Sequence, residues 1–232
     1  MSELEWTRYF FVYILQVFVF IFFVIITFKI LKRNRNRLTS ILSTFYLLIA
    51  IGLFFNLILL PINNNPVSTI LYFITYFLIS FGQIFLIVFL RNLLNVDVDI
   101  DSKADLFIIF IYGLLISIPF FIPEGFSFNE GTNWIPIYSW TFLAILYSIL
   151  TVMIIVPSTI LFKKLYNKFE KIELKKKLRY FTAGSYGMFF ISYGAVLYNT
   201  WQNPIFKLIW TFLSLTIIPF AFLIYYGIAQ NL

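Results

Sequence analysis

The chain has 232 residues, of which 61% are hydrophobic and only 12% are charged, about half the charged share of an average soluble domain. It has no Cys and no His, which excludes disulfides, zinc sites built on these residues and histidine-based acid–base catalysis. A soluble core of this length cannot bury so much apolar surface, which includes 31 Phe. We therefore expect a lipid bilayer to surround the chain.

Seven uncharged apolar segments follow one another along the chain, and each is long enough to cross a bilayer. Hydrocarbon offers the backbone no hydrogen bonds, so each span must form a helix that satisfies its own N–H and C=O groups. The sequence thus predicts an all-α fold, a seven-transmembrane-helix bundle that forms one domain over residues 1–232 of a multi-pass cell-membrane protein. The predicted spans are Tyr9–Phe28, Leu38–Leu60, Val67–Leu90, Leu106–Ile122, Ile137–Phe162, Tyr180–Tyr198 and Leu208–Ala229.

Basic residues predict the orientation of these spans. Short loops rich in Lys and Arg stay in the cytoplasm, and this places the N-terminus outside and the C-terminus in the cytoplasm. Only Arg8 and Lys207 then lie outside. Topology explains the net charge of +7, and we expect no nucleic-acid partner. The fifteen cytoplasmic residues are Lys29, Lys32, Arg33, Arg35, Arg37, Arg91, Lys103, Lys163, Lys164, Lys168, Lys171, Lys175, Lys176, Lys177 and Arg179.

Local patterns predict details of several segments. Ser102 and Asp105 have the spacing of a capping box at the start of the fourth span. Pro157 and Pro219 should kink the fifth and seventh spans. The link between the fifth and sixth spans is expected to continue as helix, because Leu165, Phe169 and Ile172 recur with helical spacing and Glu173 precedes Lys177 by four residues.

Small residues in the sixth span predict a close helix contact. Ala183, Gly187 and Gly194 share one face, and small side chains let helices approach closely. Static packing is the default interpretation of this face, and a sliding or dimerising surface is the alternative.

The predicted spans contain no charged residue, and all ten acidic residues fall in loops or termini. Ion pumps and proton relays rely on charged residues within the membrane, so we expect neither. Asp97, Asp99 and Asp101 alternate in a cytoplasmic loop, but the glycine and glutamate of a calcium loop are missing. The sequence predicts no enzyme, no catalytic or metal site and no cofactor.

Uncharged polar residues and tryptophans gather in the predicted outer half. All five tryptophans, Trp6, Trp134, Trp140, Trp201 and Trp210, fall near the outer interface, whereas Gln83 is the one strong polar residue of the inner half. Helix-to-helix hydrogen bonds and an aromatic belt are one explanation. The other is an outward-facing pocket for a small ligand. Its candidate residues are Gln16, Asn56, Ser139, Trp140, Ser192, Trp201 and Thr211.

The basic link after the fifth span is a second candidate surface. It would contact a separate cytoplasmic signalling partner or anionic lipids of the inner leaflet, which attract Lys and Arg near the membrane surface, although topology alone also explains its charge. The candidate residues are Lys163, Lys164, Lys168, Lys175, Lys176, Lys177 and Arg179.

The last third of the chain resembles the seven-helix sensor module of prokaryotic histidine kinases and of stand-alone archaeal relatives. The basic stretch Lys175–Arg179, the sequence Tyr-Phe-Thr-Ala-Gly at residues 180–184 and the ending Leu-Ile-Tyr-Tyr-Gly-Ile at residues 223–228 carry the resemblance. It implies sensing with a cytoplasmic output, which we expect a separate partner to supply, since we expect no output domain after the seventh span.

The predicted function is therefore a receptor-like membrane sensor for a small apolar or lipid-like ligand, which signals through its cytoplasmic loops. A carrier or channel for a neutral solute is the first alternative, and it would need a polar path to both faces. A structural or assembly subunit of a membrane complex is the second.

Overall fold

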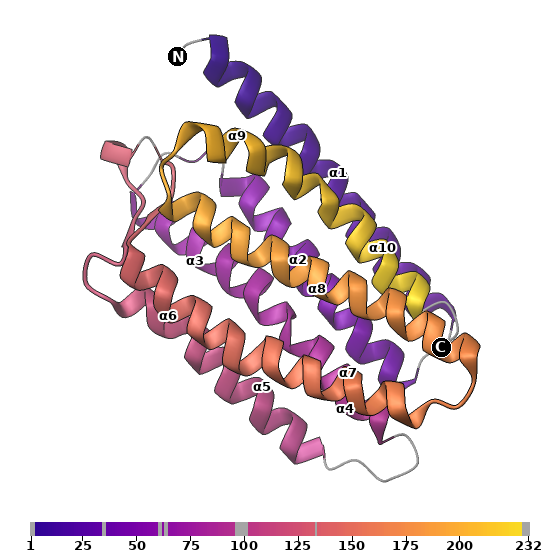
Figure 1. Ribbon diagram of the computed structural model, residues 1–232. Helices are drawn as coiled ribbons and strands as arrows, with labels where there is room; N and C mark the ends of the chain where they lie inside the picture. Colours follow the sequence, from indigo (N-terminus) through magenta and orange to yellow (C-terminus); the bar gives the residue numbers. More distant parts are fainter. Residues whose placement is uncertain are drawn as a thin grey trace.

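The computed structural model describes residues 3–33, 36–59, 62, 65–95, 102–132 and 134–228, except the side chains of 3–12, 65 and 102. These residues form seven helical rods that run side by side (Figure 1). Helices α3 and α4, α6 and α7, and α9 and α10 each join end to end into one rod. The helices are α1 Glu3–Arg33, α2 Arg37–Leu59, α3 Asn65–Gly82, α4 Ile84–Leu94, α5 Ser102–Ser117, α6 Trp140–Leu150, α7 Val156–Lys168, α8 Ile172–Thr200, α9 Pro204–Leu213 and α10 Ile217–Gly227.

Six of the seven rods are long and apolar enough to cross a membrane, so the fold is that of a multi-pass helical membrane protein. The remaining rod, α8, carries several tyrosines, glycines and serines that lower its hydropathy. It runs beside α10 and also contacts α6, α7 and α9. A helix wrapped by other helices faces protein as much as lipid, so it needs less apolar surface than its neighbours.

Three helices begin at capping side chains in the loops. Asn36 Oδ1 accepts a hydrogen bond from Thr39 N at 2.8 Å before α2, and Ser139 Oγ accepts from Phe142 N at 3.1 Å before α6. Asn203 accepts from the first turn of α9, where Pro at the first position needs no partner for its nitrogen. Each cap satisfies backbone N–H groups that the helix leaves free.

Two rods are interrupted one turn before a proline. A π-helical turn at Thr151–Ile155 precedes Pro157, and a 3-10 turn at Ser214–Thr216 precedes Pro219. Proline has no N–H for the carbonyl four residues earlier, and in both rods that residue lies within the irregular turn. The prolines thus disturb their helices as expected, and the change in backbone geometry lies upstream of each ring.

The rod formed by α3 and α4 is interrupted without a proline. The helical pattern breaks at Gln83, whose N–H bonds to Ser80 O at 3.2 Å and whose carbonyl accepts from Leu86 N at 3.1 Å. Both are bonds between residues three apart, so the helix tightens locally. The sequence analysis predicted an unbroken span here.

The boundaries of two other predicted elements are wrong. Ile137 and Tyr138 form strand β2, which pairs antiparallel with β1 Phe126–Ser127, so the fifth rod begins only at Trp140. The link between the fifth and sixth rods is not one continuous helix, because α7 ends at Lys168 and α8 begins at Ile172. The predicted pair of Glu173 and Lys177 is present at 3.1 Å.

Glycines bring α8 against the last rod. A Cβ on Gly187 would lie 2.2 Å from the Phe220 ring, and one on Gly194 would lie 1.7 Å from the Trp210 ring. Gly184, rather than the exposed Ala183, completes this contact. Gly187 and Gly194 of the predicted face therefore pack against the last rod of the same chain, whereas Ala183 does not.

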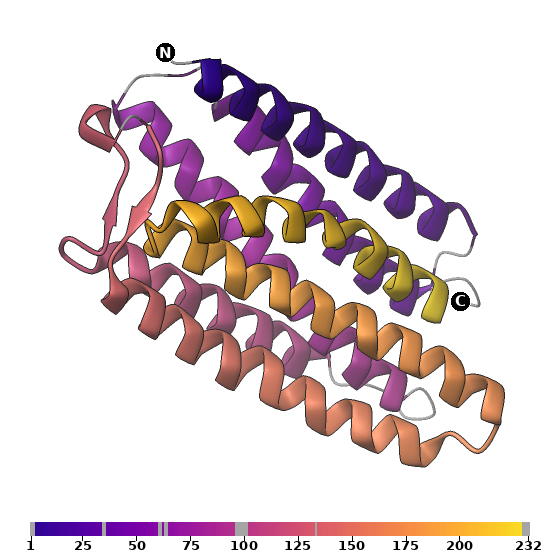
Figure 2. The same ribbon diagram turned by 45° about the horizontal axis from the view of Figure 1, so that its top comes forward.

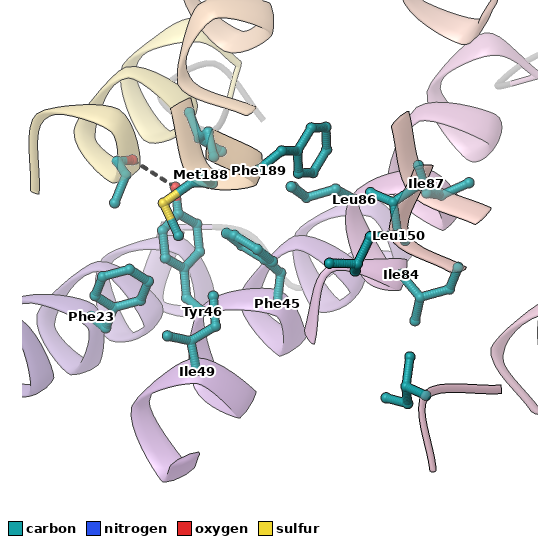
Figure 3. Packing of buried hydrophobic residues seen from close by; sticks show 14 of the residues in the cluster. Phe23, Phe45, Tyr46, Ile49, Ile84, Leu86, Ile87, Leu150, Met188 and Phe189 are labelled. Atoms are coloured by element: carbon teal, nitrogen blue, oxygen red, sulfur yellow. Dashed lines mark hydrogen bonds between the residues drawn. The ribbon is translucent and has the colours of Figure 1, made fainter. Parts of the chain in front are cut away.

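Buried aromatic and aliphatic side chains fill the centre of the bundle (Figure 3). Phe23 from α1 and Phe45 and Tyr46 from α2 are fully buried there, as is Leu86 from α4. The Tyr46 hydroxyl donates to the Ala221 carbonyl of α10 at 2.8 Å, which links the second rod to the last.

Candidate functional site

The two ends of the bundle differ in composition. Arg37, Arg91 and the basic ends of α7 and α8 lie at one end, where α1 and α10 also finish (Figure 1). Trp134, Trp140 and Trp201 lie toward the other end, near the β-strands. We call these the basic end and the tryptophan end. Their separation agrees with the charge pattern that predicted the orientation.

The structure splits the seven predicted ligand residues into separate places. Asn56 Nδ2 donates to Gln16 Oε1 at 2.9 Å between α2 and α1, whereas Ser192 lies on α8 and accepts from Gln83 Nε2 at 2.6 Å. Thr211 donates to the Lys207 carbonyl of its own helix at 2.8 Å.

The other three predicted ligand residues lie at the tryptophan end. Ser139 serves as the cap of α6. Trp140 is 61% exposed and Trp201 is 44% exposed, the latter stacked on Phe206. Polar contacts between helices therefore account for several of these residues, and the contacts present do not join the seven into one site.

A short β-hairpin covers the tryptophan end (Figure 2). We call residues 123–139 the lid. Its Phe126 and Phe128 both stack with Tyr72 of α3, each at 5.2 Å between ring centroids, and with each other at 6.3 Å. The Tyr138 hydroxyl makes a short contact with the Tyr72 hydroxyl, and Asn199 Nδ2 of α8 donates to the latter at 3.5 Å. The lid therefore ties together α3 and α8.

Burial governs the chemistry of this contact. Tyr138 lies outside the candidate spans, and removal from water raises the pKa of its hydroxyl above the ordinary value. The Tyr138 phenol therefore stays neutral and serves as a hydrogen-bonding group rather than as an acid or base.

Two unpartnered hydroxyls lie in α3 just beneath the lid contact. Thr75 is 4% exposed and Tyr76 is 8% exposed, and neither hydroxyl has a hydrogen-bond partner among the described residues. The Tyr76 ring packs edge-on against Phe120 and Phe142. Buried polar groups are normally paired, and among the described residues Asn92 Oδ1, Ser158 Oγ and Ser185 Oγ are the other buried side-chain atoms that lack a partner.

Between this level and the basic end, the buried face of α4 is apolar. Gln83 bonds Ser192 near mid-depth, and the next buried polar side chain of α4 is Asn92. Between them the buried side chains of α4 are all apolar: Ile84, Leu86, Ile87, Val88, Phe89 and Leu90.

An ion cluster closes the basic end. The Asp105 side chain of α5 is 6% exposed and accepts from Arg91 Nη1 at 2.7 Å and from Arg37 Nη2 at 3.0 Å. Asn92 Nδ2 also donates to it at 2.7 Å. One carboxylate thus joins α2, α4 and α5.

Sequence analysis missed the Asp105 cluster and assigned Asp105 to a capping box with Ser102, whose side chain lies outside the described residues. The available signal was an acid directly before the fourth apolar segment and an arginine directly after the third. The loop aspartates Asp97, Asp99 and Asp101 also lie outside the described residues.

The predicted basic residues surround the turn between α7 and α8. Lys163, Lys164, Lys168 and Lys176 are exposed. Lys168 Nζ donates to the Leu94 carbonyl of α4 at 2.8 Å, which ties this turn to the neighbouring rod. The other predicted basic residues are Lys175, Lys177 and Arg179, and all seven lie at the basic end.

In the described parts of the chain, no three acidic side chains come together in a cluster that could bind a metal ion. Comparison with known protein families, curated proteins and solved structures finds no match to this chain. The class that the fold defines is therefore the multi-pass helical membrane protein, and the function has to be argued from the residues themselves.

Proposed function

We propose that this protein is a receptor-like sensor with seven membrane spans, its N-terminus outside and its C-terminus in the cytoplasm. A small, largely apolar ligand with one polar group binds beneath the lid. The signal leaves through the basic ends of α7 and α8, which contact a separate cytoplasmic partner.

The seven-span topology rests on the position of α8. This helix has 29 residues, runs alongside the six apolar rods and joins the basic end to the tryptophan end. Its central residues are packed against other helices, which explains its lower hydropathy. With the basic end in the cytoplasm, the arrangement obeys the positive-inside rule.

The ligand site rests on the unpartnered hydroxyls of Thr75 and Tyr76, and this single observation carries the proposal. They are surrounded by aromatic rings, which suit an apolar ligand, and each offers a hydrogen bond. The lid above them is built from two short strands, which are easily displaced.

Transmission follows from the interrupted rod. Tyr72 of α3 contacts the lid, Gln83 bonds α8 at the break, and Arg91 of α4 bonds Asp105 at the basic end. A change in the lid contact tilts α3 relative to α4 at the break, and α8 carries the shift to its basic start. Local helix irregularities frequently occur at functional sites.

The resemblance of the last third of the chain to prokaryotic sensor modules is a second, independent argument for sensing. The first alternative, a carrier or channel, needs a polar path to both faces, and the apolar packing of α4 between Gln83 and Asn92 disfavours it. Neutral-solute flux into proteoliposomes discriminates the two functions.

Topology is tested with single cysteines on the two sides of α8. The chain has no cysteine, so Lys171→Cys and Gln202→Cys each create one unique label site. A membrane-impermeant thiol reagent applied to intact cells should label Gln202→Cys and leave Lys171→Cys unlabelled until the cells are opened. Labelling of both variants in intact cells contradicts the proposal.

Sensing is tested by coupling across the membrane. An environment-sensitive fluorophore on Lys171→Cys in proteoliposomes should change its emission when Tyr138→Phe weakens the lid. The matched control is Tyr226→Phe, which removes a half-exposed hydroxyl of α10 that does not touch the lid. Equal spectra for both variants mean that the lid and the basic end are not coupled, and the sensor proposal then fails.

A further inference from the structure

Two surface hollows lie next to each other along the seam between α7 and α8 at the basic end. They measure about 400 and 360 Å³ and share Tyr166 and Arg179 in their linings, so they form one continuous depression. We call it the α7–α8 groove.

The deeper part of this groove is apolar. Phe162 of α7 and Leu178 of α8 are buried beneath it, and Ala183 forms part of its rim. Ile160, which precedes Lys163 by three residues on α7, is half-exposed and continues the apolar surface toward the tryptophan end. This part of the groove suits a hydrocarbon chain.

The mouth of the groove is cationic and centred on Tyr166. Arg179 Nη2 donates to the Tyr166 hydroxyl at 2.7 Å. Arg179 and the Lys175 ammonium lie over the Tyr166 ring, 5.5 and 5.2 Å from its centroid, and Lys163 and Lys176 complete the lining. Two cations therefore lie over the Tyr166 ring, and two more line the hollows on either side of the Tyr166–Arg179 pair.

This positive charge is not neutralised within the described parts of the chain. Glu173 pairs with Lys177, which lies outside the lining, and no carboxylate there pairs with Lys163, Lys175, Lys176 or Arg179. Tyr166 accepts a hydrogen bond from Arg179, and its own hydroxyl proton has no acceptor among the described groups. The mouth thus offers several donors to an anion.

We infer that the α7–α8 groove is a binding site for an anionic phospholipid. The headgroup phosphate lies between Lys163 and Arg179 and accepts a hydrogen bond from Tyr166, while an acyl chain occupies the apolar part beside Phe162 and Ala183. Charge complementarity selects the phosphate, and the apolar floor distinguishes a lipid from a soluble anion. The inference needs the basic end to lie at a membrane surface, and it does not depend on the proposed sensing.

The site is tested by native mass spectrometry of the full-length protein with phosphatidylglycerol or phosphatidylcholine added. The double variant Lys163→Gln/Arg179→Gln should bind phosphatidylglycerol roughly tenfold more weakly or worse. The matched control Lys164→Gln/Lys171→Gln removes two exposed cations outside the groove lining and should bind like the unaltered protein. An equal loss in both double variants means diffuse charge attraction and overturns the site.

A second variant separates lipid from free phosphate. Ala183→Phe fills the apolar part and keeps every cation, so phosphatidylglycerol binding should fall while the thermal stability of the protein is retained. Unchanged binding by this variant overturns the proposed acyl position. Inorganic phosphate should not displace phosphatidylglycerol from the unaltered protein; displacement at comparable concentrations identifies an anion site without a lipid.

Tyr166→Phe keeps the aromatic ring that the cations contact and removes only the hydroxyl group. A few-fold loss of phosphatidylglycerol affinity, with unchanged phosphatidylcholine binding, is expected. No loss contradicts the role given to the hydroxyl. Failure of the topology or coupling experiments above leaves these outcomes unaffected, so the two proposals fail separately.

Discussion

The tryptophan end and the basic end are held together by opposite chemistry. At the tryptophan end, stacked rings and neutral phenols join the lid to α3 and α8. At the basic end, one buried carboxylate binds two arginines and joins α2, α4 and α5. Aromatic contacts weaken gradually as a segment moves, whereas a buried charge that loses its partner is costly. The comparison predicts that the tryptophan end yields more easily than the basic end.

Removal of the central carboxylate should have the largest effect. Asp105→Ala leaves Arg37 and Arg91 without their shared partner and should lower the free energy of unfolding by roughly 2–3 kcal/mol, which is below the value for fully buried pairs because both arginines are partly exposed. Thermal unfolding in detergent measures the loss. Asp105→Asn keeps an acceptor and is the matched control with a smaller loss.

The same variant also tests the contrast between the two ends. The loss in Asp105→Ala should shrink in high salt, which screens the charges in the unaltered protein. If Asp105→Ala lowers the free energy of unfolding by less than the lid variants described next, the basic end is not the more rigid of the two ends.

Lid variants should have an intermediate effect. Tyr72→Phe leaves the Tyr138 hydroxyl without its closest partner in a buried place and should cost about 1–2 kcal/mol. The double variant Tyr72→Phe/Tyr138→Phe should cost less than the sum of the two single changes, because no buried phenol then loses a partner. Denaturation of all three variants gives the coupling energy, and strict additivity would show that the two phenols do not interact.

Replacement at the helix break should have the smallest effect on stability. Gln83→Leu removes the hydrogen bond to Ser192, and such bonds between membrane helices are worth about 0.6 kcal/mol on average. Ser192 keeps its bond to the Met188 carbonyl. In the fluorophore assay, however, this variant should reduce the response to lid weakening. A large loss of stability with an unchanged response would place Gln83 in the framework instead.

Much of the architecture could be predicted from one sequence because the bilayer imposes a simple rule on each segment. Apolar length marked the positions of all seven rods, and the basic residues assigned to one side do gather at one end. Apolar length is a property of one segment, and the basic residues are simply counted loop by loop. Neither prediction therefore requires knowing which helices are in contact.

The missed features depend on contacts between distant residues. Asp105 meets Arg37 from 68 positions earlier in the chain, and no local pattern marks that encounter. Strand β2 has two residues, and its apolar Ile137 and Tyr138 looked like the start of a helix. No proline in the third span indicates the break at Gln83. For the candidate site, hydroxyl-bearing residues in α3 looked like ordinary span residues until their burial and missing partners were known.

The central position of α8 has a consequence for how the protein is made. A translocon releases segments into lipid according to their own hydrophobicity, and α8 has the lowest hydropathy among the seven rods for this step. Its glycines match Trp210 and Phe220, which are synthesised later in the chain. In the proposed seven-span arrangement, stable integration of α8 should therefore wait for α9 and α10, so that the last two rods enter the bilayer as one pair.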